Sequence, residues 1–168
     1  MKILGVDPGT TGALALFDTV SRRLVVEDMP VVRVVTRSSG QKRPQIADPL
    51  LSGMIRQFAP DIAFLERVHA LPKQGVTSTF TFGMSYGIVR GVLAALNIPV
   101  NLVTPQQWKS TIRVGRDKAE ARLIAARLFP DHGAVFSRVR DDGRAEAALL
   151  AWFGAHHGLS IQTPPDLP

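Results

Sequence analysis

Apolar runs dominate the first part of the chain and predict three strands close together. These runs are KILGVD (2–7), ALALFD (13–18) and RRLVVEDMP (22–30), and only short turns lie between them. Strands joined by short turns pair in an antiparallel way. We therefore predict an antiparallel meander, followed by a basic, exposed loop or hairpin over residues 31–45.

Beyond this meander, apolar residues recur at helical spacing, and helices alternate with strands. The pattern predicts strands at 61–66 and 98–105, and helices at 48–60, in the later part of 73–97, and at 105–112, 115–130 and 141–158. Such alternation implies parallel crossovers beside the meander. The expected fold is α/β, with a mixed five-stranded sheet, helices on both faces, one domain over 1–158 and a loose tail over 159–168.

Charge and composition narrow the class of partner. Lysine and arginine number 20 against 14 acidic residues, which gives a formal charge of +6 and favours a polyanionic partner such as nucleic acid. The chain has no cysteine, which excludes disulfides and thiolate metal sites. No stretch resembles a signal peptide or a membrane span, so we expect a cytoplasmic protein.

Two acids stand where apolar strands end. Asp7 follows the first strand and Glu66 ends the strand predicted at 61–66. Ligands in α/β folds often bind at the carboxyl ends of strands. Each acid also has an ordinary interpretation, because Asp7 could shape the Pro-Gly turn that follows it and Glu66 could pair with Arg67.

The last predicted helix carries two more acids on its apolar face. Asp142 and Glu146 are four residues apart, and the stripe continues through Leu149, Leu150 and Phe153. If this face meets the strand ends, four carboxylates converge. Their mutual repulsion would be relieved by a hard divalent cation, Mg²⁺ or Mn²⁺. Two such ions can catalyse phosphodiester hydrolysis, so a basic protein with this site is a nuclease candidate.

The helix acids have ordinary interpretations as well. Asp141 or Asp142 could cap the helix, which is the commonest role of aspartate just before a helical run. Glu146 could pair with Arg144 or Lys118 as a surface charge. The metal hypothesis explains the two strand ends and the helix stripe together, whereas the alternative needs a separate reason for each.

Three segments, ILGVDPGTTGALAL, AFLERVH and DDGRAEAALLAW, resemble the RuvC family of Holliday-junction resolvases, especially compact phage and prophage forms. The resemblance implies an RNase H-like fold, a homodimer and metal-dependent nicking of two opposed strands of a four-way DNA junction. Asp7 and Glu66 match the family's acids on the first and fourth strands. Two ions per site are implied.

The last helix departs from the family pattern, which places two acids, or a histidine and an acid, three residues apart. Gly143 lies three residues before Glu146, so we assign Asp142 and Glu146 as ligands, with Asp141 in reserve. Lys109 and Lys118 are placed like the family's lysines near the cleft, where Lys118 would support the scissile phosphate. Both could equally be surface charges.

Further residues are candidates for contact with DNA. They are Lys109, Lys118, His69, Phe80, Phe82, Arg37, Lys42 and Arg43. His69 could stack on a base or serve the structure. Phe80 and Phe82 are two residues apart in what is predicted to be a loop before the helix, and they could wedge between bases or join the core. Gly83, Gly87 and Gly91 share one helix face, which would allow close packing within the fold or across a dimer.

Other functions share parts of this pattern. DPGTTG also resembles the first phosphate loop of actin-like and Hsp70-like ATPases, but the chain has no second such loop and lacks room for a second domain. A non-cutting DNA-binding protein would use basic residues such as Arg33, Arg138 and Arg140 without needing the acids. A nuclease of the same fold acting on RNA or other branched DNA is a third alternative.

Overall fold

The computed structural model describes residues 1–35, 40–68, 75–115 and 117–158, and of Lys118 only the backbone. Its main sheet has five strands in the order β3-β2-β1-β6-β7. Strands β1 (Lys2–Asp7), β2 (Ala13–Asp18) and β3 (Leu24–Asp28) form the predicted antiparallel meander. Strands β6 (Ile62–Glu66) and β7 (Val100–Val103) run parallel to β1, so the predicted mixed sheet is confirmed.

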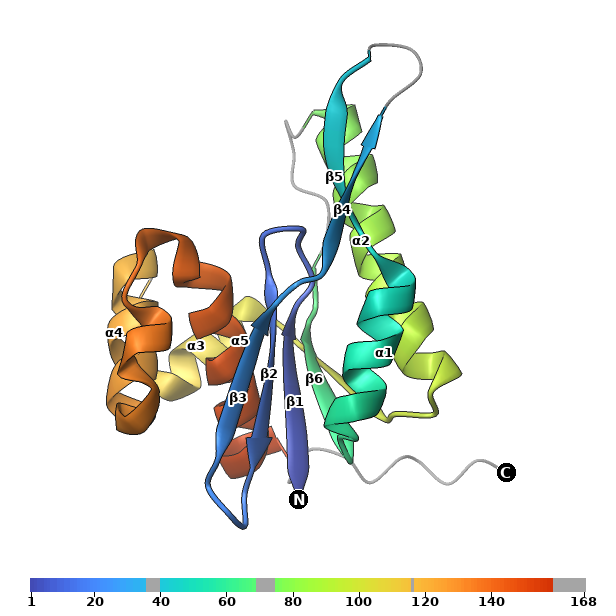
Figure 1. Ribbon diagram of the computed structural model, residues 1–168. Coiled ribbons are helices and arrows are strands. Elements are labelled where there is room, and N and C mark those ends of the chain that lie inside the picture. The colour runs from blue at the N-terminus through green and yellow to red at the C-terminus, as the bar shows by residue number, and fades with distance from the viewer. Residues whose placement is uncertain (36–39, 69–74, 116, 159–168) are drawn as a thin grey trace.

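Helices cover both faces of this sheet (Figure 1). On one face lie α1 (Asp48–Phe58) and α2 (Val76–Ala95), which pack on Leu4, Val6 and Leu65. On the other lie α3 (Pro105–Ile112), α4 (Lys118–Leu128) and α5 (Asp142–Phe153). Short helices η1 (Pro130–Phe136), η2 (Val139–Asp141) and η3 (Gly154–Gly158) complete this second layer.

Helix α5 lies directly against the central strand β1, because Gly5 presents no side chain to it. A β-carbon at Gly5 would collide with the backbone of Ala147 and Ala151. Residues 147–151 of α5 are fully buried, so the helix forms the centre of its layer. This contact sets the position of α5 relative to the strand that ends at Asp7.

A second, two-stranded sheet stands apart from the main one. Strands β4 (Val31–Val35) and β5 (Lys42–Ile46) form the predicted basic hairpin, whose tip, including Arg37, lies outside the described residues. The hairpin projects past the end of the main sheet, alongside the first turns of α2 (Figure 1). It therefore rises from the same end of the sheet at which β1 and β6 finish.

One sequence expectation about the helices is wrong. Phe80 and Phe82 were expected in a loop, but α2 already begins at Val76 and includes both. The Thr- and Phe-rich start has low intrinsic helix propensity. Its hydroxyls are satisfied inside the helix instead, since Thr79, Thr81 and Ser85 donate to backbone carbonyls four residues earlier.

Candidate active site

The two strand-end acids lie next to each other in the sheet. Strands β1 and β6 are parallel neighbours, and their register pairs Val6 with Leu65, the residues just before Asp7 and Glu66. Both acids are half-buried. The sequence prediction that these carboxylates share one edge of the sheet is therefore confirmed.

Glu66 is held by a neutral donor. The indole N–H of Trp108, on α3, donates to Oε1 of Glu66 at 3.1 Å. Burial raises the pKa of Glu66, the Trp108 hydrogen bond partly opposes this, and the nearby Glu146 carboxylate raises it further. Glu66 and Glu146 are therefore close enough to repel each other.

Glu146 is held by a lysine from the same short helix. Nζ of Lys109 lies 2.9 Å from Oε1 of Glu146, and it also lies 5.0 Å from the centre of the Trp108 ring. Helix α3 thus presents consecutive residues to two of the acids. Lys109 was predicted near the cleft, and the structure places its ammonium among the acids themselves.

Asp142 is directed to a different partner. Its carboxylate forms an ion pair with Arg122 on α4, and both side chains are largely buried. Neither the pair nor the packing of α4 on α5 could be read from the sequence. The cap interpretation does not apply to Asp142 either, because it is the first helical residue and Asp141 occupies the cap position.

The Asp141 carboxylate is buried and bonded within the fold. Its side chain is 1% exposed and accepts hydrogen bonds from the guanidinium and the backbone N–H of Arg138. Asp141 occupies the N-cap position of α5, but its side chain accepts no hydrogen bond from the first turn of that helix. The Arg138 hydrogen bonds lower the pKa of Asp141 well below its usual range. These contacts leave the carboxylate fully used within the fold, so it is a poor reserve ligand.

Gly143 occupies the position at which the family that the sequence resembles carries an acid. A β-carbon there would lie 2.7 Å from the carbonyl oxygen of Thr11 and 3.0 Å from Oδ2 of Asp7. The turn after β1 therefore packs directly on the start of α5. No side chain fits at residue 143 without moving this turn, which explains in physical terms why the acid is missing.

A metal site would have to be completed by movement of side chains. Within the described segments, no three Asp, Glu, His or Cys side chains gather as one cation site. Asp7, Glu66 and Glu146 nevertheless supply the oxygen donors that Mg²⁺ and Mn²⁺ prefer. The mutual repulsion of Glu66 and Glu146 would also be relieved by a cation. The chemistry of these donors suits such an ion, but in the structure Glu146 is paired with Lys109 and Asp142 with Arg122.

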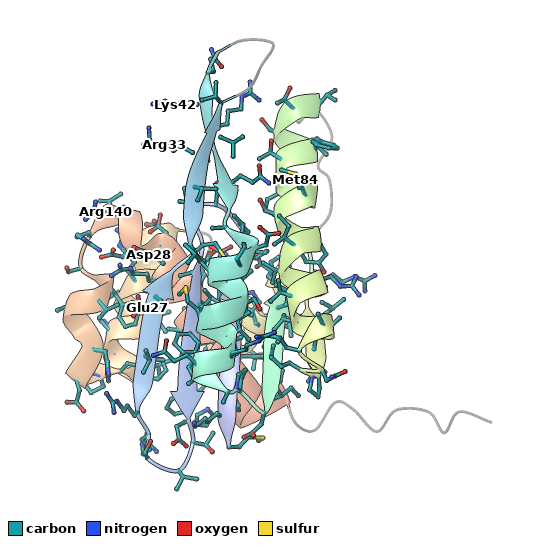
Figure 2. All side chains as sticks on the ribbon, turned by 45° about the vertical axis from the view of Figure 1, so that its right-hand side comes forward. Glu27, Asp28, Arg33, Lys42, Met84 and Arg140 are labelled. Carbon is teal, nitrogen blue, oxygen red and sulfur yellow. The ribbon has the colours of Figure 1, made fainter. Side chains whose placement is uncertain are left out.

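The predicted DNA contacts are dispersed around this edge. Arg33, Lys42 and Arg43 are exposed on the β4–β5 hairpin, and Figure 2 shows Arg33 and Lys42 extending away from α2. Phe80 is 72% exposed. Phe82 and Arg43 help to line a hollow of about 260 Å³ between the β1–β2 turn, β5 and α2.

Three of the predicted residues cannot be placed in this way. Arg37 and His69 lie outside the described residues. Lys118 is the first residue of α4, and its side chain is outside the described part of the structure. Their proposed contacts with DNA stay predictions.

An arginine-rich hollow of about 400 Å³ lies on the other side of the β1–β2 turn, and the sequence did not reveal its construction. Arg138, Arg140 and Arg144 line it together with Asp28 and Asp141. Arg144 grips Asp28 through Nε and Nη2, at 2.5 and 2.7 Å. Two of the three arginines, Arg138 and Arg144, are therefore ion-paired within the fold, and Figure 2 labels the third, Arg140, above Asp28.

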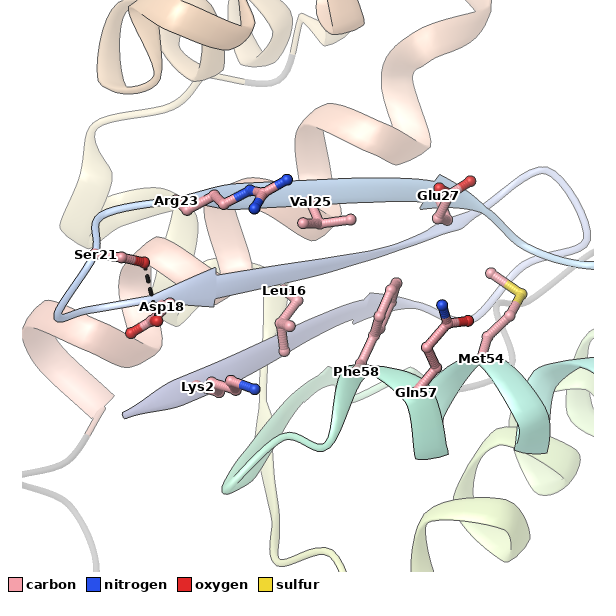
Figure 3. A pocket seen from close by; sticks show the side chains of 10 residues that line it. All are labelled: Lys2, Leu16, Asp18, Ser21, Arg23, Val25, Glu27, Met54, Gln57 and Phe58. Atoms are coloured by element: carbon pink, nitrogen blue, oxygen red, sulfur yellow. Dashed lines mark hydrogen bonds between the residues drawn. The ribbon is translucent and has the colours of Figure 1, made fainter.

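Another hollow, of about 670 Å³, is lined by none of Asp7, Glu66, Asp142 and Glu146. It runs between α1 and strands β2 and β3, with Lys2 and Ser21 at the end of the sheet opposite Asp7 (Figure 3). None of the predicted site residues lines it. We therefore place the candidate active site at the strand ends.

Comparison with known proteins gives the family. The model of the family described as "Crossover junction endodeoxyribonuclease RuvC" matches residues 3–128, a span that includes Asp7, Glu66 and Lys109. A relative of that name from Nocardioides sp. is 28% identical over 135 residues, covering 77% of this chain and 74% of the relative. Another, from Mycobacterium ulcerans, is 26% identical over 133 residues, covering 77% and 71%.

Solved structures show the same fold. Thermus thermophilus RuvC in complex with a Holliday junction substrate superposes with a TM-score of 0.59 at 15% identity, covering 96% of this chain and 97% of the other. The fowlpox virus Holliday junction resolvase gives 0.51 at 17% identity, covering 95% and 99%. The chain thus has the α/β, RNase H-like fold of these resolvases. Among the described residues, no helix is long and apolar enough to cross a membrane.

Proposed function

The chain belongs to the RuvC family of crossover junction endodeoxyribonucleases, and from that premise we propose that it resolves four-way DNA junctions by paired, symmetric nicks. One observation carries the proposal: Asp7 and Glu66 end neighbouring parallel strands, and Glu146 lies within electrostatic reach of Glu66. The family's nucleases depend on metal. The number and kind of ions, and the residues that hold them, are part of the proposal.

Asp7, Glu66 and Glu146 are the proposed ligands of two Mg²⁺ or Mn²⁺ ions, and Asp142 joins them only by leaving Arg122. Bound in this way, the ions would activate a water for attack on the phosphodiester and stabilise the departing 3′ oxygen. When Glu146 turns toward the ions it releases the ammonium of Lys109, which then becomes available to the scissile phosphate. Lys118, at the start of α4, is proposed to support the same phosphate.

The DNA arms are proposed to follow the basic surface around this edge. Arg33, Lys42 and Arg43 on the hairpin supply phosphate contacts, with Arg37, which lies between the two strands in the sequence, as a further candidate. The exposed ring of Phe80 offers a face on which a base can stack. Contacts of this kind position the duplex without reading its sequence. A steep fall in binding with rising salt would support this surface.

A homodimer through α2 would place two active sites on one junction. Gly83, Gly87 and Gly91 lie on an exposed face of α2, where an added β-carbon meets nothing within 4 Å. Packing inside the described part of the fold therefore does not explain these glycines. The exposed Val76 and Phe80 extend the same apolar face. A second copy of the chain that packs its own α2 there would cover this face and match the symmetry of the substrate.

The direct test uses synthetic four-way junctions, forks and plain duplexes, each with and without Mg²⁺, followed by mapping of the nicks. We expect two symmetric nicks in the junction, dependent on Mg²⁺. Asp7→Asn should abolish cutting and leave junction binding intact, because the basic surface is unchanged. Cutting of plain duplex as fast as of junctions would contradict the proposed substrate.

A DNA-binding protein that does not cut is the second candidate. It is favoured by the two ion pairs, Lys109–Glu146 and Arg122–Asp142, which already neutralise two of the four predicted acids. The same assay separates the candidates. Tight junction binding without nicks in either Mg²⁺ or Mn²⁺ would establish this function and overturn the nuclease proposal.

A further inference from the structure

Trp108 is fully buried, although the other residues of its helix are not. Helix α3 has eight residues, and Trp108 is its one buried side chain, with no exposed surface. The helix start is fixed by a reciprocal capping box between Thr104 and Gln107. The indole packs with Val103 and the central residues of α5 in the core of that layer. Its position in the fold is therefore well determined.

The indole N–H is directed to one oxygen of the strand-end acid. Its single donor meets Oε1 of Glu66 at 3.1 Å, 42 positions away in the chain. A buried indole needs one acceptor, and a backbone carbonyl would serve as well as a carboxylate. Here the acceptor is one of the acids at the candidate active site. The donor carries no charge, so the contact fixes the carboxylate without cancelling its charge.

The second oxygen of Glu66 stays available. Among the described residues no donor bonds to Oε2, and this atom is not one of their buried side-chain atoms without a partner. Glu146 differs, because the cation on Lys109 competes for its charge. Glu66 is thus oriented by a hydrogen bond to one carboxylate oxygen, and its other oxygen can still bind a cation. Metal ligands are typically oriented by such a partner.

We propose that Trp108 is a positioning residue, whose indole N–H holds Glu66 by Oε1 so that Oε2 can bind the divalent ion. The inference rests on the proposed function, in which Glu66 is a metal ligand. Hydrogen-bond partners of metal ligands typically change metal affinity by about 10–100-fold when they are removed. An effect of that size is measurable without any cleavage assay.

The experiment measures Mn²⁺ binding to the whole protein, without DNA, from the loss of the free-ion EPR signal. Trp108→Phe keeps an aromatic ring and removes the N–H, and we expect about 10-fold weaker binding of Mn²⁺. Trp152→Phe is the matched control, because that indole stacks on His156 at the far end of α5. Its affinity for Mn²⁺ should equal that of the unaltered protein.

A second measurement removes the risk that Trp108→Phe disturbs the core. In the Trp152→Phe background Trp108 is the only tryptophan, and its fluorescence should change as Mg²⁺ is added. Replacing Trp108 there by benzothienylalanine, which has the same shape but no N–H, should weaken Mn²⁺ binding as Trp108→Phe does. Unchanged affinity in both Trp108 variants would overturn the inference.

The two levels of the hypothesis fail in different ways. If Glu66→Gln binds Mn²⁺ as well as the unaltered protein, Glu66 is not a ligand and the metal part of the proposed function is wrong. If Glu66→Gln loses the ion while the Trp108 variants keep it, the metal site stands. In that case the indole N–H only satisfies its own need for an acceptor, and Trp108 has no positioning role.

Discussion

Carboxylates that lie close together in this molecule differ in their hydrogen-bond partners and in the direction of their pKa shifts. Asp28, Asp141 and Asp142 are each paired with an arginine, and for Asp28 and Asp141 the hydrogen bonds lower the pKa. Within the described part of the chain, the one hydrogen-bond donor to Glu66 is the indole N–H of Trp108, and burial raises the pKa of Glu66. Asp28 and Asp141 therefore gain stability by being charged, whereas Glu66 is charged at a cost.

This difference separates acids that hold the fold from acids that are free to bind. An arginine delivers several donors in a fixed fork and seldom releases its partner. The Arg144–Asp28 and Arg138–Asp141 pairs have this form. The first ties α5 to β3, and the second closes the short helix η2 just before α5. A lone indole or a lysine binds its acid at one point, so Glu66 and Glu146 can accept another ligand.

The largest expected effect is the loss of DNA cleavage when the charge of Glu66 is removed. Glu66→Gln should lower cleavage of a four-way junction by more than about 100-fold, since even an indirect change near a metal commonly costs 10–100-fold. Single-turnover cleavage with excess enzyme measures this. Glu27→Gln, an exposed acid on β3, is the matched control and should cleave normally. Equal losses in both variants would show that the two acids do not differ in role.

The next effect distinguishes the two acids of α5, Glu146 and Asp142. Glu146→Gln should reduce cleavage about as strongly as Glu66→Gln. It should change the unfolding free energy little, because the loss of the Lys109 ion pair is offset by the relief of repulsion between Glu146 and Glu66. Asp142→Asn should instead cost about 1–3 kcal/mol of unfolding free energy, because the partly buried Arg122 loses its partner. Urea unfolding and single-turnover cleavage together decide this. Complete loss of cleavage in Asp142→Asn at normal stability would place Asp142 among the ligands.

A smaller effect concerns pH. Because the pKa of Asp141 is lowered in the folded protein, its contribution is complete above the unfolded value of about 4 and is lost as pH falls through the lower folded value. Stability measured by urea unfolding should therefore fall more steeply below about pH 4 in the unaltered protein than in Asp141→Asn. Parallel curves for the two proteins would contradict the assignment.

The smallest effect has the opposite sign. Because burial raises the pKa of Glu66, the ionised side chain destabilises the fold as pH rises above its unfolded value. Glu66→Gln without metal should then melt slightly higher than the unaltered protein at pH 7, where about 1 kcal/mol corresponds to about 2–4 °C. At pH 4 the difference should vanish. A lower melting temperature at pH 7 would mean that Glu66 stabilises the fold.

The sequence predicted those parts of the molecule that depend on local pattern. The meander, the hairpin, α1 and α3 follow from periodicity and from Pro and Gly positions, and the acids at two strand ends follow from parallel pairing. The start of α2 was misjudged, because side chain to backbone hydrogen bonds and packing outweigh the propensity of its Thr and Phe residues.

What the sequence could not predict depends on contacts between distant segments. Trp108 stood beside Lys109 in the sequence, yet its link to Glu66 spans 42 positions. The role of Asp142 depends on how α4 packs against α5, and that of Arg138 on a turn between two short helices. The missing acid at Gly143 was visible in the sequence, but its cause, the turn at Thr11, was not.

The direct seating of α5 on Gly5 has a consequence for which ions the enzyme can use. Backbone packs against backbone there, and again at Gly143, so α5, which carries Glu146, is held directly against β1 and the turn after Asp7. At the proposed metal site, adaptation to a larger ion such as Ca²⁺ would therefore have to come from rotation of side chains. Selectivity between ions would then depend on the backbone, and lengthening either acid could not simply be compensated by a shift of the helix.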